Sequence, residues 1–310
     1  MAALSRAWEF VRPFTLVVPA FGMLAGGLMA WGADPRGQSD WSAGVGGTLL
    51  RLLAGMLAGA ALNGFSNGIN QIYDLEVDRV NKPHRLLPSG RLSLRAAWLI
   101  SWICLAAAVV AAAWIGTQTL LLVAAAAVLT WAYSAPPLRT KARGFWANLT
   151  IAIPRGTLLP VAGWSTVKTV QSPEPWWIGL VMGAYILGAA TTKDFSDIEG
   201  DRAGGCATLP VRYGIRRSIL LISPCFVLPF MGLALLSWLG CLQPPRSLLA
   251  VLGGVLAIWG GYIVHLLLRT PPQVFLEMNR PGAENHPSWK HMYWLSFTAQ
   301  VGLAAAYWWG

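Results

Sequence analysis

The sequence predicts an all-α polytopic membrane protein whose nine transmembrane helices form a bundle, and three observations support this class. Apolar residues make up 55% of the 310-residue chain and charged residues only 12%, whereas soluble proteins carry about 25% charged residues. Apolar runs of roughly 18 or more residues recur along the chain, and such runs can cross the hydrocarbon core of a bilayer. The basic residues also fall mostly on one set of predicted loops, as in membrane proteins.

Each predicted helix covers one apolar run. About 20 helical residues cross a hydrocarbon core of about 30 Å, and a helix satisfies its own backbone hydrogen bonds in lipid. The first run, Pro13 to Trp31, is too long for the apolar part of a signal peptide, so we interpret it as a span. The nine predicted spans are 13–31, 48–70, 96–114, 118–134, 148–166, 176–193, 218–240, 247–268 and 291–309.

The basic residues orient these spans. Seventeen Lys and Arg residues fall on one set of predicted loops, whereas the opposite set contains only Arg36, Arg51, Lys168 and Arg246. The seventeen are Arg6, Arg12, Arg79, Lys82, Arg85, Arg91, Arg95, Arg139, Lys141, Arg143, Arg202, Arg212, Arg216, Arg217, Arg269, Arg280 and Lys290. Because cytoplasmic loops are enriched in Lys and Arg, we expect this larger set and the N-terminus to be cytoplasmic. Nine spans then leave the C-terminus outside, in a protein of the cell (inner) membrane.

The net charge of +10 has the same explanation, so it does not indicate a nucleic-acid partner. No soluble segment outside the predicted spans is long enough to bind nucleic acid. The four cysteines form no C-x-x-C pair and match no zinc-ligand spacing, so no disulfide, redox or zinc function follows from them. The expected partners are therefore the lipid bilayer and small molecules.

Seven of the 13 acidic residues fall in two short segments, each at the predicted cytoplasmic end of a long apolar helix: Asp74, Glu76, Asp78, Asp194, Asp197, Glu199 and Asp201. The pattern D-x-E-x-D-R begins at Asp74 and again at Asp197. Such an internal repeat indicates two related halves. We expect one domain over 1–310, with halves at about 13–134 and 148–268 and the ninth helix at 291–309.

Helical spacing brings the carboxylates of each segment together. Asn70, Asp74 and Asp78 share one helix face, and the Asp residues of the second segment share another, while Glu76 and Glu199 point elsewhere. Carboxylates near hydrocarbon cost free energy unless they are paired or bind a metal, and ion pairs with neighbouring bases account for only some of them. All-oxygen sites suit Mg²⁺, which binds one or two carboxylates together with substrate phosphates.

Basic residues near the acidic segments are candidates for contact with a diphosphate: Lys82, Arg85, Arg139, Lys141, Lys193 and Arg202. Arg155 differs because it lies inside a predicted span, where a charged side chain is costly. We expect Arg155 to face a polar cavity, or else to form a buried ion pair with one of the Asp residues. Together these residues predict a central cavity that opens near the cytoplasmic face and receives a metal-bound diphosphate.

These motifs resemble the UbiA superfamily of intramembrane prenyltransferases. The stretch from Asn70 to Arg79 resembles that family's N-D-x-x-D-x-x-x-D box, and Lys193 to Arg202 resembles its D-x-x-D-x-x-x-D box. The stretch Tyr133-Ser-Ala-Pro-Pro resembles the loop between its fourth and fifth helices. Gln71 stands where many members have Asp, which is similar to the homogentisate prenyltransferase branch, whereas Asp194 to Gly214 looks more like chlorophyll synthases and archaeal-lipid-type members.

The resemblance implies an enzyme that ionises an isoprenyl diphosphate and transfers the prenyl group to a small, aromatic acceptor. It implies two Mg²⁺ ions, which bridge the diphosphate to Asp74, Asp78, Asp197 and Asp201, with Asn70 and Asp194 assisting. Basic residues would stabilise the leaving diphosphate, and the apolar bundle would exclude water from the allylic cation. Tyr133 and Tyr185 are candidate aromatic neighbours of that cation.

Two other functions are compatible with parts of the pattern. UbiA-type terpene cyclases share the fold, and in them the allylic cation of farnesyl or geranylgeranyl diphosphate is captured by the substrate's own double bonds. Product formation without an acceptor distinguishes a cyclase from a transferase. A transporter built from two repeated halves is disfavoured, because the acids cluster at one face and the spans lack paired broken helices.

Overall fold

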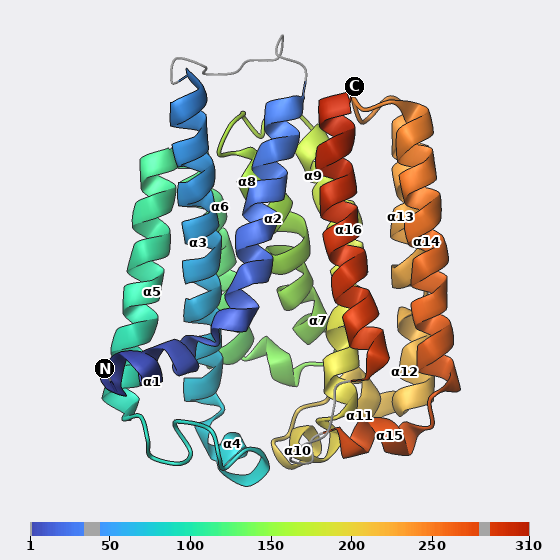
Figure 1. The fold of residues 1–310 in the computed structure, drawn as a ribbon. Helices are drawn as coiled ribbons and strands as arrows, with labels where there is room; N and C mark the ends of the chain where they lie inside the picture. The colour runs from blue at the N-terminus through green and yellow to red at the C-terminus, as the bar shows by residue number, and fades with distance from the viewer. Residues whose placement is uncertain (1, 34–43, 279–285, 310) are drawn as a thin grey trace.

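A computed structural model of the chain describes residues 2–33, 44–278 and 286–309, and every regular element in these ranges is helical. Long helices stand side by side as a bundle, and short helices gather at one of its ends (Figure 1). The N-terminal helix lies at that same end, whereas the last helix finishes at the opposite end (Figure 1). The predicted all-α class is confirmed.

The N-terminal part of the chain forms one side of the bundle. Helix α1 (Ala2–Val11) lies across the end of the bundle (Figure 1), and α2 (Pro13–Gly32) begins at a proline, whose missing N–H and fixed φ suit the first turn of a helix. Helix α3 (Gly44–Tyr73) packs against both α2 and α5 (Leu94–Ile115). Helix α6 (Thr117–Ser134) returns along α5 and α3.

The C-terminal part forms the other side, and its helices bury most of the large aromatic core. These helices are α9 (Glu174–Thr191), α12 (Ile215–Ile222), α13 (Pro224–Trp238), α14 (Arg246–Arg269) and α16 (Pro287–Trp309). Helix α13 packs against α9 and α14, and α16 packs against both α14 and α2, which closes the bundle. Phe226 and Phe230 of α13 are fully buried in this core, where apolar burial stabilises the packing.

A broken helix lies between the two sides and was predicted as the continuous span 148–166. It consists of α7 (Phe145–Ala152), a π-helical stretch (Ile153–Leu158) and α8 (Leu159–Trp164). Pro154 and Pro160 remove two backbone donors, so the regular α-helical bonding cannot continue through this stretch. Gly156 lies against α9, where a Cβ atom would come within 2.5 Å of the Gly183 Cα. Close packing of these backbones therefore requires glycine at position 156.

The short helices lie together at one end of the bundle (Figure 1). They are α4 (Leu75–Asn81), α10 (Ile198–Ala203), α11 (Leu209–Tyr213) and α15 (Pro272–Glu277). Helix α4 follows α3 and contacts α10, which follows α9. The two acidic segments of the sequence therefore meet at this end.

Within the described ranges, six helices are long and apolar enough to cross a membrane: Pro13–Gly32, Gly44–Tyr73, Leu94–Ile115, Thr117–Ser134, Ile215–Trp238 and Arg246–Arg269. Large apolar side chains such as Leu57, Ile103 and Ile258 are more than half exposed on these helices, as expected where lipid covers the surface. The chain is thus an integral membrane protein. The other predicted spans, 148–166, 176–193 and 291–309, fall on shorter or less apolar helices, so the number nine stays a prediction.

Candidate functional site

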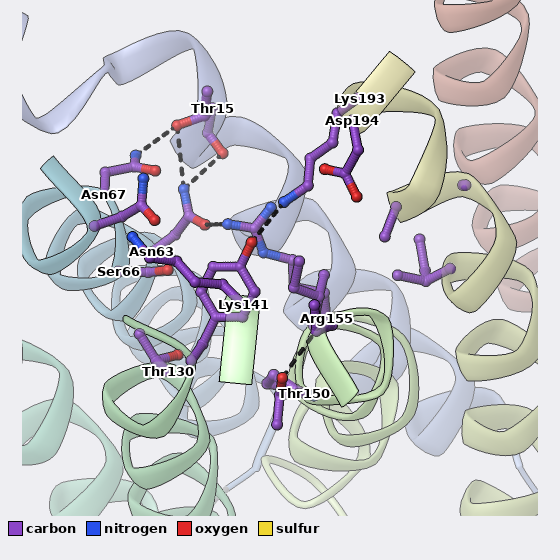
Figure 2. A pocket seen from close by; sticks show the side chains of 18 of the residues that line it. Thr15, Asn63, Ser66, Asn67, Thr130, Lys141, Thr150, Arg155, Lys193 and Asp194 are labelled. Carbon is purple, nitrogen blue, oxygen red and sulfur yellow. Dashed lines mark hydrogen bonds between the residues drawn. The ribbon is translucent and has the colours of Figure 1, made fainter. Parts of the chain in front are cut away.

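A cavity of about 500 Å³ lies inside the bundle and reaches the end where the short helices gather. Residues of α2, α3, α6, α9 and α16 line it, together with the broken helix α7–α8 and the acidic segments. Polar side chains from several of these helices point toward one another in it (Figure 2). The volume is in the range of ligand-binding pockets, so this cavity is the candidate functional site.

The two acidic segments have the same local structure. Asp74 precedes α4 with φ −95° and ψ 5°, and Asp197 precedes α10 with φ −100° and ψ 7°. The backbone N–H of Asp78 donates to the Asp74 carbonyl at 2.7 Å, and that of Asp201 to the Asp197 carbonyl at 2.8 Å. Neither Asp74 nor Asp197 caps its own helix with its side chain, which leaves both carboxylates available to the cavity.

This geometry differs from the expected continuous helices. The chain breaks its helix at Asp74 and at Asp197, because Asp favours such helix-start positions over helix interiors. The outcome for the carboxylates is nonetheless the one predicted, since all five Asp residues of the segments line the cavity. Glu76 and Glu199 are exposed and lie outside the cavity lining, and Glu76 instead pairs with Arg79 at 2.7 Å.

Basic side chains compensate the carboxylates across the cavity. Arg85 Nη1 lies 2.5 Å from Asp78 Oδ2, and Lys82 Nζ lies 3.3 Å from Asp197 Oδ1. Lys141, from the loop after α6, contacts the Asp74 carboxylate. Three of the predicted diphosphate contacts thus pair with predicted metal ligands. The Lys82–Asp197 pair joins the first acidic segment to the second.

Two carboxyls of this cluster have raised pKa values. Burial, together with the charges of Asp201 and Asp197, raises the pKa of Asp194 to about 7, while Lys193 acts in the opposite direction. Burial and the charge of Asp197 raise the pKa of Asp201 to about 6, while the hydrogen bond donated by Thr208 Oγ1 at 3.2 Å opposes the shift. A cation that neutralised this cluster would favour the ionised carboxylates.

Lys193 and Tyr133 form a hydrogen-bonded pair within the cavity lining. Lys193 Nζ donates to the Tyr133 hydroxyl at 2.9 Å and lies 5.2 Å from the centre of the Tyr133 ring. Both line the cavity, as does Arg139. Tyr185 also lines it, but its hydroxyl donates to the Met292 carbonyl at 2.7 Å and its ring packs against Phe226 and Phe230. The Tyr185 side chain therefore connects α9 to α13 and α16.

Arg155 faces the cavity from the π-helical stretch. Its Nη2 donates to Asn63 Oδ1 at 3.4 Å, and Figure 2 shows its guanidinium among the polar side chains of α2 and α3. Asn63 and Asn67 in turn donate to Thr15 Oγ1 at 3.2 and 2.7 Å. Arg155 thus faces the cavity, as one of the two expectations had it. Among the described residues it does not form the alternative ion pair with an Asp residue.

Of the predicted site residues, only Arg202 lies outside the cavity lining, and its side chain is exposed. Gln71 also turns away, because its Nε2 donates to the Phe10 carbonyl at 2.9 Å and so fastens α1 to α3. The cavity lining includes residues that no motif had indicated: Arg12, Thr15, Asn63, Ser66, Asn67, Thr208, Ser296 and Gln300. Most of these are polar residues on apolar helices, which is the signal that had identified Arg155.

The carboxylates fit a metal that is bound together with a phosphate ligand. In the part of the chain that the structure describes, no three His, Cys, Asp or Glu side chains converge closely enough to hold a metal ion by themselves. Mg²⁺ does not require such a cage, because it is usually bound by one or two carboxylates and by substrate phosphates. The oxygen donors of Asn70 and the five Asp residues match that preference.

The fold and this cavity define a polytopic helical membrane protein with a charged binding site inside its bundle. The model of the UbiA prenyltransferase family matches residues 16–274. The chain therefore belongs to the UbiA prenyltransferase family, and the predictions of that family and of a prenyltransferase are confirmed.

Known relatives agree with this assignment. The chain is 31% identical over 242 residues to the bacteriochlorophyll synthase 34 kDa chain of Chloroflexus aurantiacus, which covers 78% of this chain and 73% of that protein. It is also 31% identical over 265 residues to the chloroplastic homogentisate solanesyltransferase of Arabidopsis thaliana, and this match covers 81% of this chain and 67% of that protein. A solved structure of a UbiA homologue from Archaeoglobus fulgidus, bound to GPP and Mg²⁺, has the same fold, with a TM-score of 0.68 and 20% sequence identity. The match covers 96% of this chain and 99% of that chain.

Proposed function

We propose that this protein is a Mg²⁺-dependent membrane prenyltransferase that ionises an isoprenyl diphosphate and transfers the prenyl group to a small, aromatic acceptor. The observation that carries the proposal is the pairing of the two acidic segments across one cavity, through Lys82 and Asp197. Carboxylates of both segments and basic side chains lie together there. A metal-bound diphosphate requires both, because carboxylates bind the metal and basic side chains bind the phosphate oxygens. The GPP and Mg²⁺ of the A. fulgidus homologue support it.

In this proposal Asp74, Asp78, Asp197 and Asp201 hold two Mg²⁺ ions, with Asn70 and Asp194 assisting. When bound, Mg²⁺ supplies charge stabilisation for the departing diphosphate. Lys82, Arg85 and Lys141 contact carboxylates, and they would turn to the diphosphate oxygens when the substrate binds. Arg139 and Lys193 line the same cavity and would add donors, while the exposed Arg202 is left out of this set.

The inner part of the cavity suits the hydrocarbon chain and the reactive cation. Apolar residues of α2 and of the broken helix, among them Val18 and Leu159, line it beyond the charged end. A dry, apolar environment protects an allylic cation from capture by water. Tyr133 stands at the boundary between the charged and the apolar parts, where its ring can stabilise positive charge.

The proposed topology has nine membrane crossings, built from two related halves and a ninth helix. The N-terminus and the mouth of the cavity face the cytoplasm, and the C-terminus lies outside the cell (inner) membrane. The uneven distribution of Lys and Arg supports this orientation. Helix α1 lies at one end of the bundle and α16 finishes at the opposite end (Figure 1), as an odd number of crossings would require.

The test is diphosphate release by the protein in nanodiscs. Geranyl, farnesyl and geranylgeranyl diphosphates are supplied with Mg²⁺, with and without homogentisate, hydroquinone, 4-hydroxybenzoate and an acylphloroglucinol, and products are identified by mass spectrometry. Turnover that requires an acceptor supports the transferase. A cyclic hydrocarbon or alcohol formed without acceptor assigns the protein to the terpene cyclases instead. Absence of diphosphate release under all conditions contradicts both.

A further inference from the structure

A buried amide in the cavity lining is not used by the proposed diphosphate chemistry. Gln300 of α16 lines the cavity, and its side chain is only 7% exposed. Its Nε2 donates to Ser296 Oγ at 3.2 Å, but among the described residues its Oε1 has no hydrogen-bond partner. A buried carbonyl oxygen without a partner costs free energy, so this amide is poised to accept a hydrogen bond from a ligand.

The Gln300 amide lies where α16 packs against α2. A Cβ atom added at Gly22 would lie only 3.3 Å from Gln300 Oε1, so this oxygen is in close contact with α2. The terminal torsion of a Gln side chain is broad, so we expect rotation about it to turn the oxygen toward a ligand in the cavity. Ser296 and Tyr293 precede Gln300 at helical spacing on the same face of α16 and also line the cavity.

A second, much smaller pocket lies beside the cavity and has a mostly apolar lining. This pocket, of about 60 Å³, lies between α2, α3, α6 and α8, and its lining includes Leu62, Leu122 and Ala126. Asn63 and Arg155 line both spaces, whereas Gln300 and Ser296 line only the main cavity. A prenyl chain offers no hydrogen-bonding group, so it cannot pair with Gln300 Oε1 and is best buried against apolar side chains.

We infer that the α2–α16 side of the cavity binds the prenyl acceptor, and that Gln300 with Ser296 hydrogen-bonds a hydroxyl group of that acceptor. A hydroxyl both donates and accepts, so it pairs with either end of the amide. The inference rests on the proposed transferase function and extends it by naming a second-substrate site and its ligand class, a hydroxylated small molecule.

The test compares Gln300→Met with the wild-type protein, because Met keeps the size of the side chain and removes the hydrogen-bonding groups. The probes are geranylgeranyl diphosphate with homogentisate, hydroquinone, 4-hydroxybenzoate or the acylphloroglucinol, each beside its methyl ethers. The variant should raise the KM for a hydroxylated acceptor roughly tenfold, the size of one neutral hydrogen bond, and lose the preference for hydroxyl over methyl ether. Ser296→Ala should shift the same KM in the same direction.

Two further measurements separate this function from a structural one. Binding of geranylgeranyl thiolodiphosphate with Mg²⁺, measured by thermal shift, should be unchanged in Gln300→Met. The Tm of the empty variant should be equal to or above that of the wild type, because an unpaired buried oxygen has been removed. The control is Gln118→Leu, whose amide is fully paired with Thr169 and Val170 outside the cavity; it should lower the Tm and leave the acceptor KM unchanged.

Each outcome decides between the inference and the function on which it rests. An unchanged acceptor KM in Gln300→Met, an equal loss of affinity for both substrates, or a lowered Tm with no change in acceptor preference overturns the inference. Diphosphate release by a wild-type protein that binds none of the hydroxylated acceptors also overturns it and leaves the diphosphate chemistry intact. A wild-type protein that neither binds geranylgeranyl thiolodiphosphate nor releases diphosphate contradicts the proposed function itself, and the inference with it.

Discussion

Lys82 Nζ lies 3.3 Å from Asp197 Oδ1, although the two residues belong to different acidic segments of the chain. The contact brings the end of α4 to the start of α10 and so aligns two segments that have the same local backbone structure. The Lys82 ammonium compensates the negative charge of the Asp197 carboxylate. The same pair predicts how the site should respond to substitution.

Replacing Lys82 with Met should weaken binding of the prenyl diphosphate more than it slows the chemistry. A charge-assisted hydrogen bond contributes about 1.5–3 kcal/mol, so we expect the KM for the diphosphate to rise by roughly 10- to 100-fold with a smaller change in kcat. Steady-state kinetics at saturating Mg²⁺ measures both. Arg79→Met is the matched control, because Arg79 belongs to the same short helix but pairs with Glu76 outside the cavity; an equal effect of the two variants would contradict a specific function for Lys82.

Replacing Asp74 or Asp197 with Asn should abolish most of the diphosphate release. Each substitution removes a proposed metal ligand from one segment, and losing one such transition-state contact costs about 100-fold or more in rate. A coupled assay for released diphosphate measures the effect over a range of Mg²⁺ concentrations. Glu76→Gln, in the same motif but exposed, should keep the wild-type rate. Full activity in the Asp74→Asn variant would remove the basis of the proposed metal site.

The metal-free protein should lose stability as the pH rises. The pKa of Asp194 is raised to about 7 in the folded protein, whereas an unfolded Asp has a pKa of about 3.9. The folded state therefore holds the proton more tightly; its contribution to stability is complete below pH ~4 and is lost as the pH rises through ~7. Thermal unfolding in EDTA between pH 5 and 8 should show a falling Tm.

Two controls accompany the pH series. Asp194→Asn should make the dependence shallower, because one of the two carboxyls with a raised pKa is gone and Asp201 remains. Addition of Mg²⁺ with geranylgeranyl thiolodiphosphate should restore stability at the higher pH, where the carboxylates are ionised and bind a cation. A Tm in EDTA that stayed constant or rose over this range would show that Asp194 has no raised pKa.

Replacing Gly156 with Ala should destabilise the protein and reduce activity together. The new methyl group would meet the backbone of Gly183 on α9, and overpacking of this kind costs about 1–3 kcal/mol. The resulting shift moves the neighbouring Arg155 away from Asn63. Gly254→Ala is the control, because no atom lies within 4 Å of a Cβ at that helical position, and its Tm should be unchanged or higher. Unfolding in detergent and diphosphate release are the two measurements.

The motifs identified the carboxylates that line the charged end of the cavity, because their spacing is a local property of the sequence. Asp74 and Asp78, and likewise Asp197 and Asp201, are four residues apart, so any helical or near-helical backbone places each pair on one side. For this reason the carboxylates of each pair lie on the same side even though the helix breaks at the first of them. Arg155 could be placed in a polar cavity because a guanidinium in an apolar helix has few other options.

The polar residues of the cavity that lie outside the acidic motifs could not be predicted from the motifs. Asn63, Ser296 and Gln300 lie in no repeated pattern, and a single polar residue on an apolar helix is as compatible with helix packing as with ligand binding. Their function depends on which helices meet: α2 packs against α16, so Gln300 faces Gly22. The partner of Arg155 was likewise undetermined, because Asn63 and the Asp residues were equally available in the sequence.

The sequence by itself determined the class of the protein, the positions of the long helices and the identity of the acidic segments, because hydropathy, charge distribution and motif spacing are properties of adjacent residues. Only the tertiary structure decided which carboxylate meets which base and that Arg202 stays outside the cavity. These outcomes depend on contacts between different segments of the chain, such as the contact between Lys82 and Asp197, and such contacts are fixed only when the helices pack.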